Sequence, residues 1–256
     1  MTLDVWLHDR RVGRLSEDRS GLSFAYSTEA MDEPARSRLS VRLPVRAEPY
    51  AHREAAAFFD NLLPEEDARA AIAQAARFSV SDTVALLGAV GGECAGAVSL
   101  WPEGMTPPAP AAEHYVPCAR GDARILGDPL ATAELVAELR GGRQSMSGAQ
   151  QKLVLLRRGD AYWLPRAGSP TTVLVKRSRG RFPGLLQNEH FAMRLLAAAG
   201  TTIARAQPCA LDDALYECLR YDRVDDGARV ARLHQEDFCQ ATGRSPRAKY
   251  AASASR

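Results

Sequence analysis

Residues 171–189 read TTVLVKRSRGRFPGLLQNE, and this stretch decides the fold of the second half of the chain. It opens with a β-branched and apolar run that ends in Lys176, which predicts a strand with a lysine at its end. A basic segment with glycine and proline interrupts this pattern. Leu186–Ala199 then predicts a helix that ends at Gly200 and carries Glu189 near its start.

Strand-like segments flank this stretch on both sides. Lys152–Leu156 and Ala161–Leu164 predict one hairpin, and Ala206–Leu211 and Leu215–Leu219 predict a second. The resulting order of strand, strand, strand, helix, strand, strand resembles that of the amino-terminal lobe of a protein kinase. We therefore expect an open sheet with one helix inserted between its third and fourth strands.

The first hundred residues have a pattern of their own, with short strands at the start, helices in the middle and one closing strand. Apolar side chains recur at helical spacing in the middle part, and small and acidic residues mark the helix starts. The expected elements are strands at Leu3–Leu7, Val12–Leu15, Leu22–Tyr26 and Ala95–Leu100, and helices at Glu54–Leu63, from Pro64, and over Asp82–Ala89 with Ser81 as its cap.

A segment rich in proline and alanine, residues 102–112, separates these two patterns. Proline removes amide donors and blocks helix formation, so the segment is expected to be extended. The sequence therefore predicts an α+β chain in three parts. These are a small strand and helix subdomain over residues 1–101, a linker over 102–112, and a second part over 113–256 that is like the N-lobe of a protein kinase, with most of the C-lobe missing.

The composition is that of a globular protein: of 256 residues, 46% are hydrophobic and 25% charged, and the formal net charge is +2. This balance argues neither for nor against a nucleic-acid partner. The five cysteines and five histidines show no metal-ligand spacing, so we expect reduced thiols and no metal site. The chain starts without a signal-peptide pattern and no apolar run reaches membrane-spanning length, so we expect a cytoplasmic protein.

A loop of small and polar residues, Gln144–Lys152, precedes the first of these strands. Backbone amides in such a loop can approach phosphate oxygens, and the side chains of Ser147 and Lys152 can add further donors. The loop matches neither the Walker pattern nor the glycine-rich loop of protein kinases. An ordinary turn of serine and glycine is therefore the alternative.

Lys176 and the segment Leu219–Arg223 are the other candidates for a binding site. A lysine at a strand end can neutralise phosphate charge when a helix carboxylate, here that of Glu189, holds it. A solvated lysine is the alternative. Backbone groups of Leu219–Arg223 can bind an adenine with Tyr221 beside the base, and the alternative is a strand end with a surface Asp–Arg pair of little energetic weight.

In their order along the chain, these segments resemble the HipA family of serine/threonine kinases, the toxin halves of bacterial type II toxin–antitoxin pairs. Each segment alone is modest, whereas six in the same order are specific. The segments that carry the resemblance are Phe58–Pro64, Ser145–Lys152, Thr171–Lys176, Asn188-Glu189, Tyr221–Arg223 and Leu233–Gln240.

The resemblance implies an ATP site and a set of partners. The partners would be a helix-turn-helix antitoxin (HipB-like) bound through residues 1–101, operator DNA reached through that antitoxin, and a protein target of translation such as an aminoacyl-tRNA synthetase. No membrane partner is implied. The residues carried over are Ser147, Gly148, Ala149, Gln150, Gln151 and Lys152 over the phosphates, Lys176 with Glu189 as its helix partner, Leu219–Tyr221 as the adenine hinge, and Ser145 as the site of autophosphorylation.

Two departures from the family pattern accompany the resemblance. Leu219 occupies a hinge position at which the family has an acidic residue. No asparagine follows Asn188, so the catalytic aspartate and the metal-binding asparagine of the second lobe are expected beyond Tyr250 and are not present. We therefore expect a truncated kinase that is inactive alone, with Mg²⁺ bound only when the missing lobe is supplied. The alternatives are a non-catalytic antitoxin-binding module and a chain completed in trans.

Overall fold

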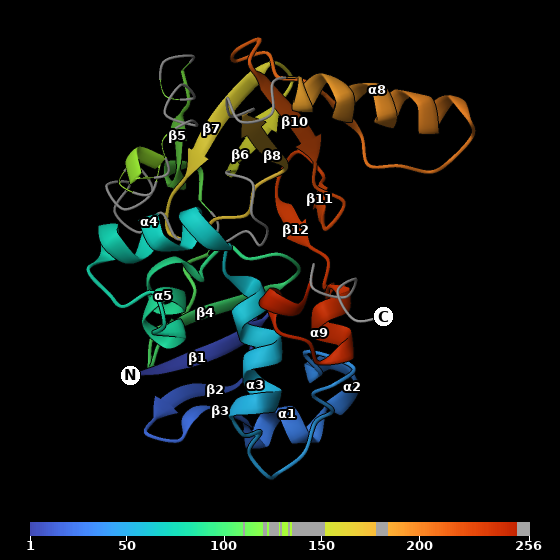
Figure 1. Cartoon of the computed structure of the whole chain (residues 1–256). Helices are drawn as coiled ribbons and strands as arrows, with labels where there is room; N and C mark the ends of the chain where they lie inside the picture. The colour runs from blue at the N-terminus through green and yellow to red at the C-terminus, as the bar shows by residue number, and fades with distance from the viewer. Residues whose placement is uncertain are drawn as a thin grey trace.

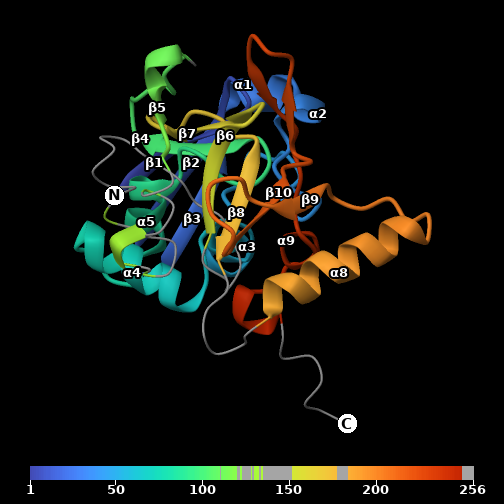
Figure 2. The same cartoon turned by 90° about the horizontal axis from the view of Figure 1, so that it is seen from above.

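The computed structural model describes residues 1–109, 111–119, 152–177 and 184–249, together with isolated positions between 122 and 134 (Figure 1). Two antiparallel sheets organise these residues. The smaller sheet and the helices that cover it span residues 2–102 and are called the N-terminal body below. The larger sheet lies next to this body in both views (Figures 1 and 2).

The smaller sheet has four strands in the order β3-β2-β1-β4. Each of the strands expected from the sequence is present, although the last begins later than predicted. Residues 93–97 are used instead for contacts with residues 220–232, as described below. The strands are β1 (Thr2–Leu7), β2 (Arg10–Asp18), β3 (Gly21–Tyr26) and β4 (Val98–Pro102).

The helices of the N-terminal body cover this sheet and close its core. Apolar side chains of the sheet meet Phe58 and Phe59 of α3, and the rings of Phe24 and Phe59 lie 5.3 Å apart. Burial of such aromatic and aliphatic side chains is the main favourable contribution to this fold. The helices are α1 (Thr28–Asp32), α2 (Pro34–Ser37), α3 (His52–Phe59), η1 (Asp60–Leu62), α4 (Glu66–Ala76) and α5 (Thr83–Val90).

Two predicted helix starts were wrong by one or two residues. Helix α4 begins at Glu66 with Glu65 as N-cap, so Pro64 precedes the helix and does not occupy its first turn. Helix α5 is capped by Asp82, whose carboxylate accepts the backbone N–H of Ala85, and not by Ser81. A carboxylate is a good acceptor at this position and also suits the positive end of the helix dipole.

The larger sheet has six strands in the order β5-β7-β6-β8-β10-β9. Its core includes Leu153, Leu155, Val173 and Val175, which alternate along their strands and share one face of the sheet, while Val154 and Leu156 of β6 are buried on the other face. The predicted hairpins are confirmed as β6 with β7 and β9 with β10. The strands are β5 (Tyr115–Pro117), β6 (Lys152–Arg158), β7 (Ala161–Pro165), β8 (Val173–Arg177), β9 (Ala206–Pro208) and β10 (Leu215–Leu219).

Helix α8 (Leu185–Ala198) projects from this sheet, with much of its length away from the body of the protein (Figures 1 and 2). Leu186 is its one buried residue. Phe191 is 66% exposed, and Leu195 and Leu196 are exposed as well. The helix predicted around Glu189 is therefore present, but most of its apolar side chains contact solvent.

Residues 220–249, called the returning segment below, leave the larger sheet and run back along the N-terminal body (Figure 1). The Nε2 of Gln240 donates to the Phe58 carbonyl at 3.1 Å, and the Nδ2 of Asn61 donates to the Arg244 carbonyl at 3.0 Å. The two halves of the chain are thus packed together. The segment contains β11 (Arg223–Asp225), β12 (Val230–Arg232), α9 (Phe238–Thr242) and η3 (Pro246–Ala248), while η2 (Ala112–His114) precedes the larger sheet.

Two glycines permit the close approach of the two halves. Gly96 has φ +73°, and a Cβ there would lie 2.8 Å from the carbonyl oxygen of Gln235. Gly168 has φ +66°, and its Cβ would lie 2.9 Å from the Cα of Gly92. Only glycine combines this backbone conformation with such short contacts. Within the described residues, none of the helices has the length and apolar character to cross a bilayer.

Candidate functional site

Lys176 and Glu189 form the ion pair that the sequence suggested. The Nζ of Lys176 on β8 donates to Oε1 of Glu189 on α8 at 2.6 Å. Both side chains are partly buried, so solvent screens the pair less than it would a surface pair. The alternative of a solvated lysine at a strand end was therefore wrong.

Lys152 lies directly across from Lys176, because the two residues are partners in the antiparallel register of β6 and β8. Side chains at such paired positions point to the same face of a sheet. Burial, and next the charge of Lys176, lower the pKa of Lys152 to about 8. Two ammonium groups therefore lie side by side, which favours binding of an anion between them.

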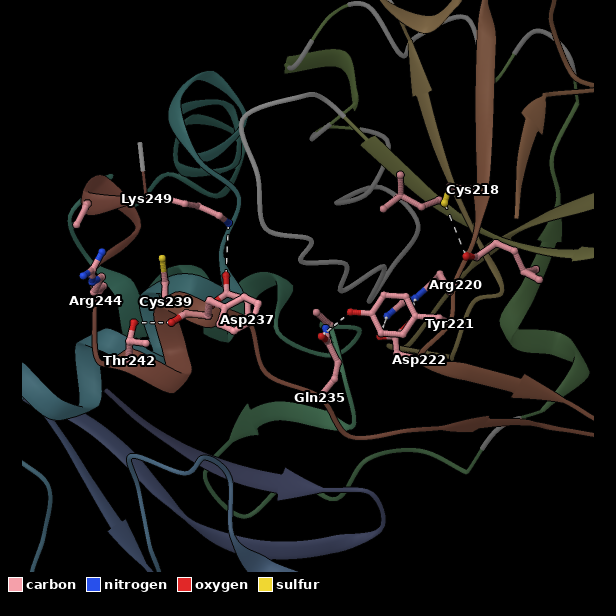
Figure 3. Close-up of a pocket in the computed structure, with 15 residues that line it drawn as sticks. Cys218, Arg220, Tyr221, Asp222, Gln235, Asp237, Cys239, Thr242, Arg244 and Lys249 are labelled. Carbon is pink, nitrogen blue, oxygen red and sulfur yellow. Dashed lines mark hydrogen bonds and ion pairs between the residues drawn. The ribbon is translucent and has the colours of Figure 1, made fainter. Parts of the chain in front are cut away.

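A cavity of about 660 Å³ opens on this same face of the sheet (Figure 3). Leu174 on β8 and Cys218 on β10 line it, and they are partners in the strand register just as Lys176 and Tyr216 are. Because Leu174 and Lys176 are two residues apart on one strand, both face the cavity side. The volume is in the range of small-molecule sites in proteins.

Leu219–Asp222, at the end of β10 and the start of the returning segment, line one side of the cavity, and residues 235–249 of the same segment line the other (Figure 3). Tyr221 is 70% exposed, and its hydroxyl donates to Oε1 of Gln235 at 2.7 Å. Phe238 is 88% exposed at the start of α9, where the Asp237 side chain caps the helix.

Lys249 reaches the cavity from the returning segment. Its Nζ lies 3.4 Å from Oε1 of Glu65 and 3.4 Å from Oδ2 of Asp237. Burial opposes the charged form, but the Asp237 and Glu65 carboxylates raise the pKa of Lys249 above its usual value. We call Lys152, Lys176 and Lys249, with their carboxylate partners Glu65, Glu189 and Asp237, the lysine cluster.

A second group of charges lies where the two halves of the molecule meet, and we call it the arginine cluster: Glu93, Arg220, Asp222, Arg223 and Arg232. The fully buried Glu93 accepts from Arg220 Nη1 at 2.7 Å and from Arg223 Nη2 at 3.0 Å, and its Oε2 lies 2.8 Å from Arg232 Nη2. The predicted alternative of a surface Asp–Arg pair was wrong, because Arg220, Asp222 and Arg223 are all buried.

Backbone groups of the N-terminal body complete the arginine cluster. The carbonyl of Cys94 accepts from both Arg220 and Arg223, at 3.0 and 2.8 Å, and the N–H of Gly96 donates to Asp222 at 2.8 Å. Three guanidinium groups face two carboxylates, which leaves one excess positive charge. Burial lowers the pKa of Arg223 to about 10, so that Arg223 remains charged at neutral pH.

The structure brings Lys152, Lys176 and Glu189 together and places Tyr221 on the cavity wall. It adds Lys249, Cys218 and the arginine cluster, which sequence reasoning missed. All five cysteines are free thiols, and no group of metal-binding side chains occurs among the residues described here. The remaining predicted residues lie outside the described part of the chain: Ser145, Ser147, Gly148, Ala149, Gln150 and Gln151.

Fold and site together define a mixed α/β protein with a ligand-sized cavity between its larger sheet and the returning segment. Comparison with protein families gives two matches, to the HipA N-terminal domain over residues 3–101 and to the HipA-like C-terminal domain over residues 144–256. The chain belongs to the HipA family.

Individual relatives agree with this assignment. A Sinorhizobium fredii protein named "Putative kinase Y4mE" is 42% identical over 97% of this chain and 61% of its own length. The serine/threonine-protein kinase toxin HipA of Shewanella oneidensis is 28% identical over 98% of this chain and 57% of its own. The chain thus spans about three fifths of the length of these relatives.

A solved structure supports the same relation. The Shewanella oneidensis HipA, in a complex with HipB and its operator DNA, superposes with a TM-score of 0.76 at 26% identity. The match covers 95% of this chain and 57% of the other. The mixed α/β architecture of the chain is therefore that of HipA.

Proposed function

We propose that residues 1–256 form the nucleotide-binding half of a HipA-type serine/threonine kinase from a bacterial toxin–antitoxin pair, acting in the cytoplasm. The Lys176–Glu189 pair beside the cavity carries this proposal. In protein kinases a strand lysine, held by a carboxylate of the following helix, neutralises the phosphates of ATP. The same order occurs here: Lys176 lies on a strand, Glu189 on the helix that follows, and the segment after β10 lines the cavity. In this reading, the larger sheet with α8 is an amino-terminal kinase lobe.

The cavity and its surroundings fit ATP by size and by charge. Leu174 and Tyr221 of the cavity lining offer apolar and aromatic surface for a base. Lys152 and Lys176, on the same face of the sheet as Leu174, offer positive charge for phosphates. ATP supplies the phosphoryl group, and the protein side chains hold and orient it. Following the family resemblance, Ser147–Gln151 cover the phosphates, and Ser145 is the site of autophosphorylation.

We further propose that residues 1–256 alone do not transfer phosphate. Phosphoryl transfer requires metal ions that offset the negative charge and a residue that orients the nucleophile. The family resemblance assigns both tasks to a second lobe, with an aspartate and a metal-binding asparagine, and no asparagine follows Asn188 in this sequence. Binding of ATP and its chemistry can therefore be tested separately.

A HipB-like antitoxin with a helix-turn-helix fold is the partner that we propose, and residues 1–101 are its proposed docking region. The support is the Shewanella oneidensis complex, in which HipA is present with HipB and operator DNA. Contact with operator DNA would then occur through the antitoxin. Co-purification of the chain with the helix-turn-helix protein encoded beside it tests this, and the absence of any association would contradict it.

Binding of a fluorescent ATP analogue to the purified chain tests the nucleotide site. We expect Lys176→Met and Glu189→Gln to weaken binding, the former by roughly 10- to 100-fold, because one charge-assisted contact to phosphate is lost. Arg194→Met is the matched control, since this exposed residue lies on the same helix as Glu189. Undetectable binding by the wild-type chain, or equal binding by Lys176→Met, would overturn the proposal.

Incubation with radiolabelled Mg-ATP tests the proposal that residues 1–256 alone do not transfer phosphate. The chain alone should give neither autophosphorylation nor transfer to a protein substrate. Labelled product that disappears in the Lys176→Ala variant would show that residues 1–256 are active.

A further inference from the structure

Lysine is rare in this chain, and its positions are not scattered. Of the 33 basic residues, three are lysines and thirty are arginines. The three lysines are Lys152, Lys176 and Lys249, and the charges of the last two both act on Lys152. Elsewhere in the described part of the chain, ion pairs on the surface and in the interior use arginine.

One of the three lysines, Lys249, lines the cavity, and the other two lie on the face of the larger sheet that carries Leu174 of the cavity lining. Lys152 and Lys176 are cross-strand partners on the larger sheet. Lys249 lines the cavity from the opposite wall, next to Asp237 (Figure 3). The charge of Lys249 is also among the causes that lower the pKa of Lys152, after burial and Lys176. A phosphate chain between the two walls would therefore have positive charge on both sides.

A purely structural role for Lys249 would explain its contacts but not its identity. Lys249 connects Glu65 of the N-terminal body to Asp237, and both distances are long, at 3.4 Å. An arginine fork can bind two carboxylates at once and holds them in fixed geometry. Apart from Lys176–Glu189, every other ion pair given for the described residues uses arginine.

We propose that Lys249 is a third phosphate-binding lysine of this site, held by Glu65 and Asp237 until a nucleotide binds. This inference rests on the proposed nucleotide site and extends it to the returning segment. Lysine suits the role because its compact ammonium group sits on a flexible stem and can move between partners. The long contacts to Glu65 and Asp237 are easily exchanged for a phosphate oxygen.

The experiment compares ATP with adenosine as ligands of the wild-type chain, Lys249→Met and Lys249→Arg. We expect both variants to weaken ATP binding about tenfold, the equivalent of one charge-assisted contact, and to leave adenosine binding within twofold. In Lys249→Arg the guanidinium should bind Glu65 and Asp237 more firmly. Its thermal midpoint should therefore equal or exceed that of the wild type although ATP affinity falls.

Arg247→Met is the control, because Arg247 is exposed in η3, two residues from Lys249. It should change neither ligand's affinity. A role of Lys249 as a structural link alone predicts a different result, with ATP affinity retained in Lys249→Arg, and that result would overturn the inference. If the wild-type chain bound neither ligand, the proposed site would fail and the inference with it. If the wild-type chain bound ATP and the Lys249 variants bound it equally well, the proposed site would stand and only the inference about Lys249 would be overturned.

Discussion

The arginine cluster and the lysine cluster are built from the same two kinds of charge, yet they differ in burial and in the number of acceptors that each cation binds. In the first, guanidinium groups are buried and bound to carboxylates and to backbone carbonyls at 2.7 to 3.0 Å. In the second, the lysine side chains are partly exposed; Lys176 binds Glu189 at 2.6 Å, whereas the contacts of Lys249 are 3.4 Å long. The arginine cluster fixes the two halves of the molecule together, whereas the lysine cluster keeps charge available beside a cavity.

The choice of cation explains this difference. A guanidinium group offers five donors in a rigid plane, so it can satisfy several buried acceptors at once. An ammonium group is a compact point charge that changes partners at small cost. The sequence therefore separates cations that hold structure from cations that we propose to bind ligand.

The largest expected effect is the loss of Glu93 from the arginine cluster. Glu93→Gln removes a buried charge that faces the buried Arg220 and Arg223 and the partly buried Arg232, and a broken buried ion pair costs about 3–5 kcal/mol. We therefore expect the free energy of unfolding, measured by urea denaturation, to fall by this amount in the variant. Glu103→Gln is the control, because its pair with Arg14 is largely exposed and should contribute less than about 0.5 kcal/mol. Equal effects of the two variants would contradict the special role of the arginine cluster.

Exchanging the cations between the clusters gives the next largest effect. Arg223→Lys should lower the free energy of unfolding by about 2 kcal/mol or more, because lysine cannot reach Glu93, Asp222 and the Cys94 carbonyl together. Lys176→Arg should change it by less than about 1 kcal/mol, since a cation still faces Glu189. Similar losses in both variants, measured by urea denaturation, would remove the distinction between the clusters.

Acid should weaken the arginine cluster in a defined pH range. Burial raises the pKa of Glu93 and of Asp222, but the surrounding arginines lower both pKa values below the ordinary 4.5 and 3.8. Both carboxylates are thus charged in the folded state at pH values where the unfolded chain binds protons. Their contribution is complete above about pH 4.5 and is lost as the pH falls through the folded pKa values, at up to about 1.4 kcal/mol per pH unit and group. Glu93→Gln should flatten the stability curve below pH 4.5, and an unchanged slope would contradict this assignment.

The smallest effect is expected on α8, the helix that carries Glu189. Phe191→Ala together with Leu195→Ala should change the free energy of unfolding by no more than about 0.5 kcal/mol, because both side chains are exposed. Leu186→Ala on the buried side should cost about 2 kcal/mol or more. A large loss from the double variant would show that the exposed face of α8 is packed in solution.

The sequence predicted the lysine cluster better than the arginine cluster. Lys176 and Glu189 are 13 residues apart and lie on adjacent elements, so local patterns place them together. Glu93 is separated from Arg220 by 127 residues, and nothing in the Gly-Gly-Glu-Cys context marks it as a partner. The scarcity of lysine in the sequence could have marked Lys249 as a candidate site residue. Its position opposite Lys152 depends on the path of the returning segment, which no local pattern determines.

That path has a consequence for synthesis on the ribosome. At about 5 to 20 residues per second, the 127 residues from Cys94 through Arg220 take roughly 6 to 25 s to be added. During this interval the nascent N-terminal body has its strands and helices but lacks the guanidinium groups that Glu93 binds and the amide of Gln240 that reaches Phe58. Its assembly is therefore completed late, and until then chaperones and proteases meet an unfinished surface.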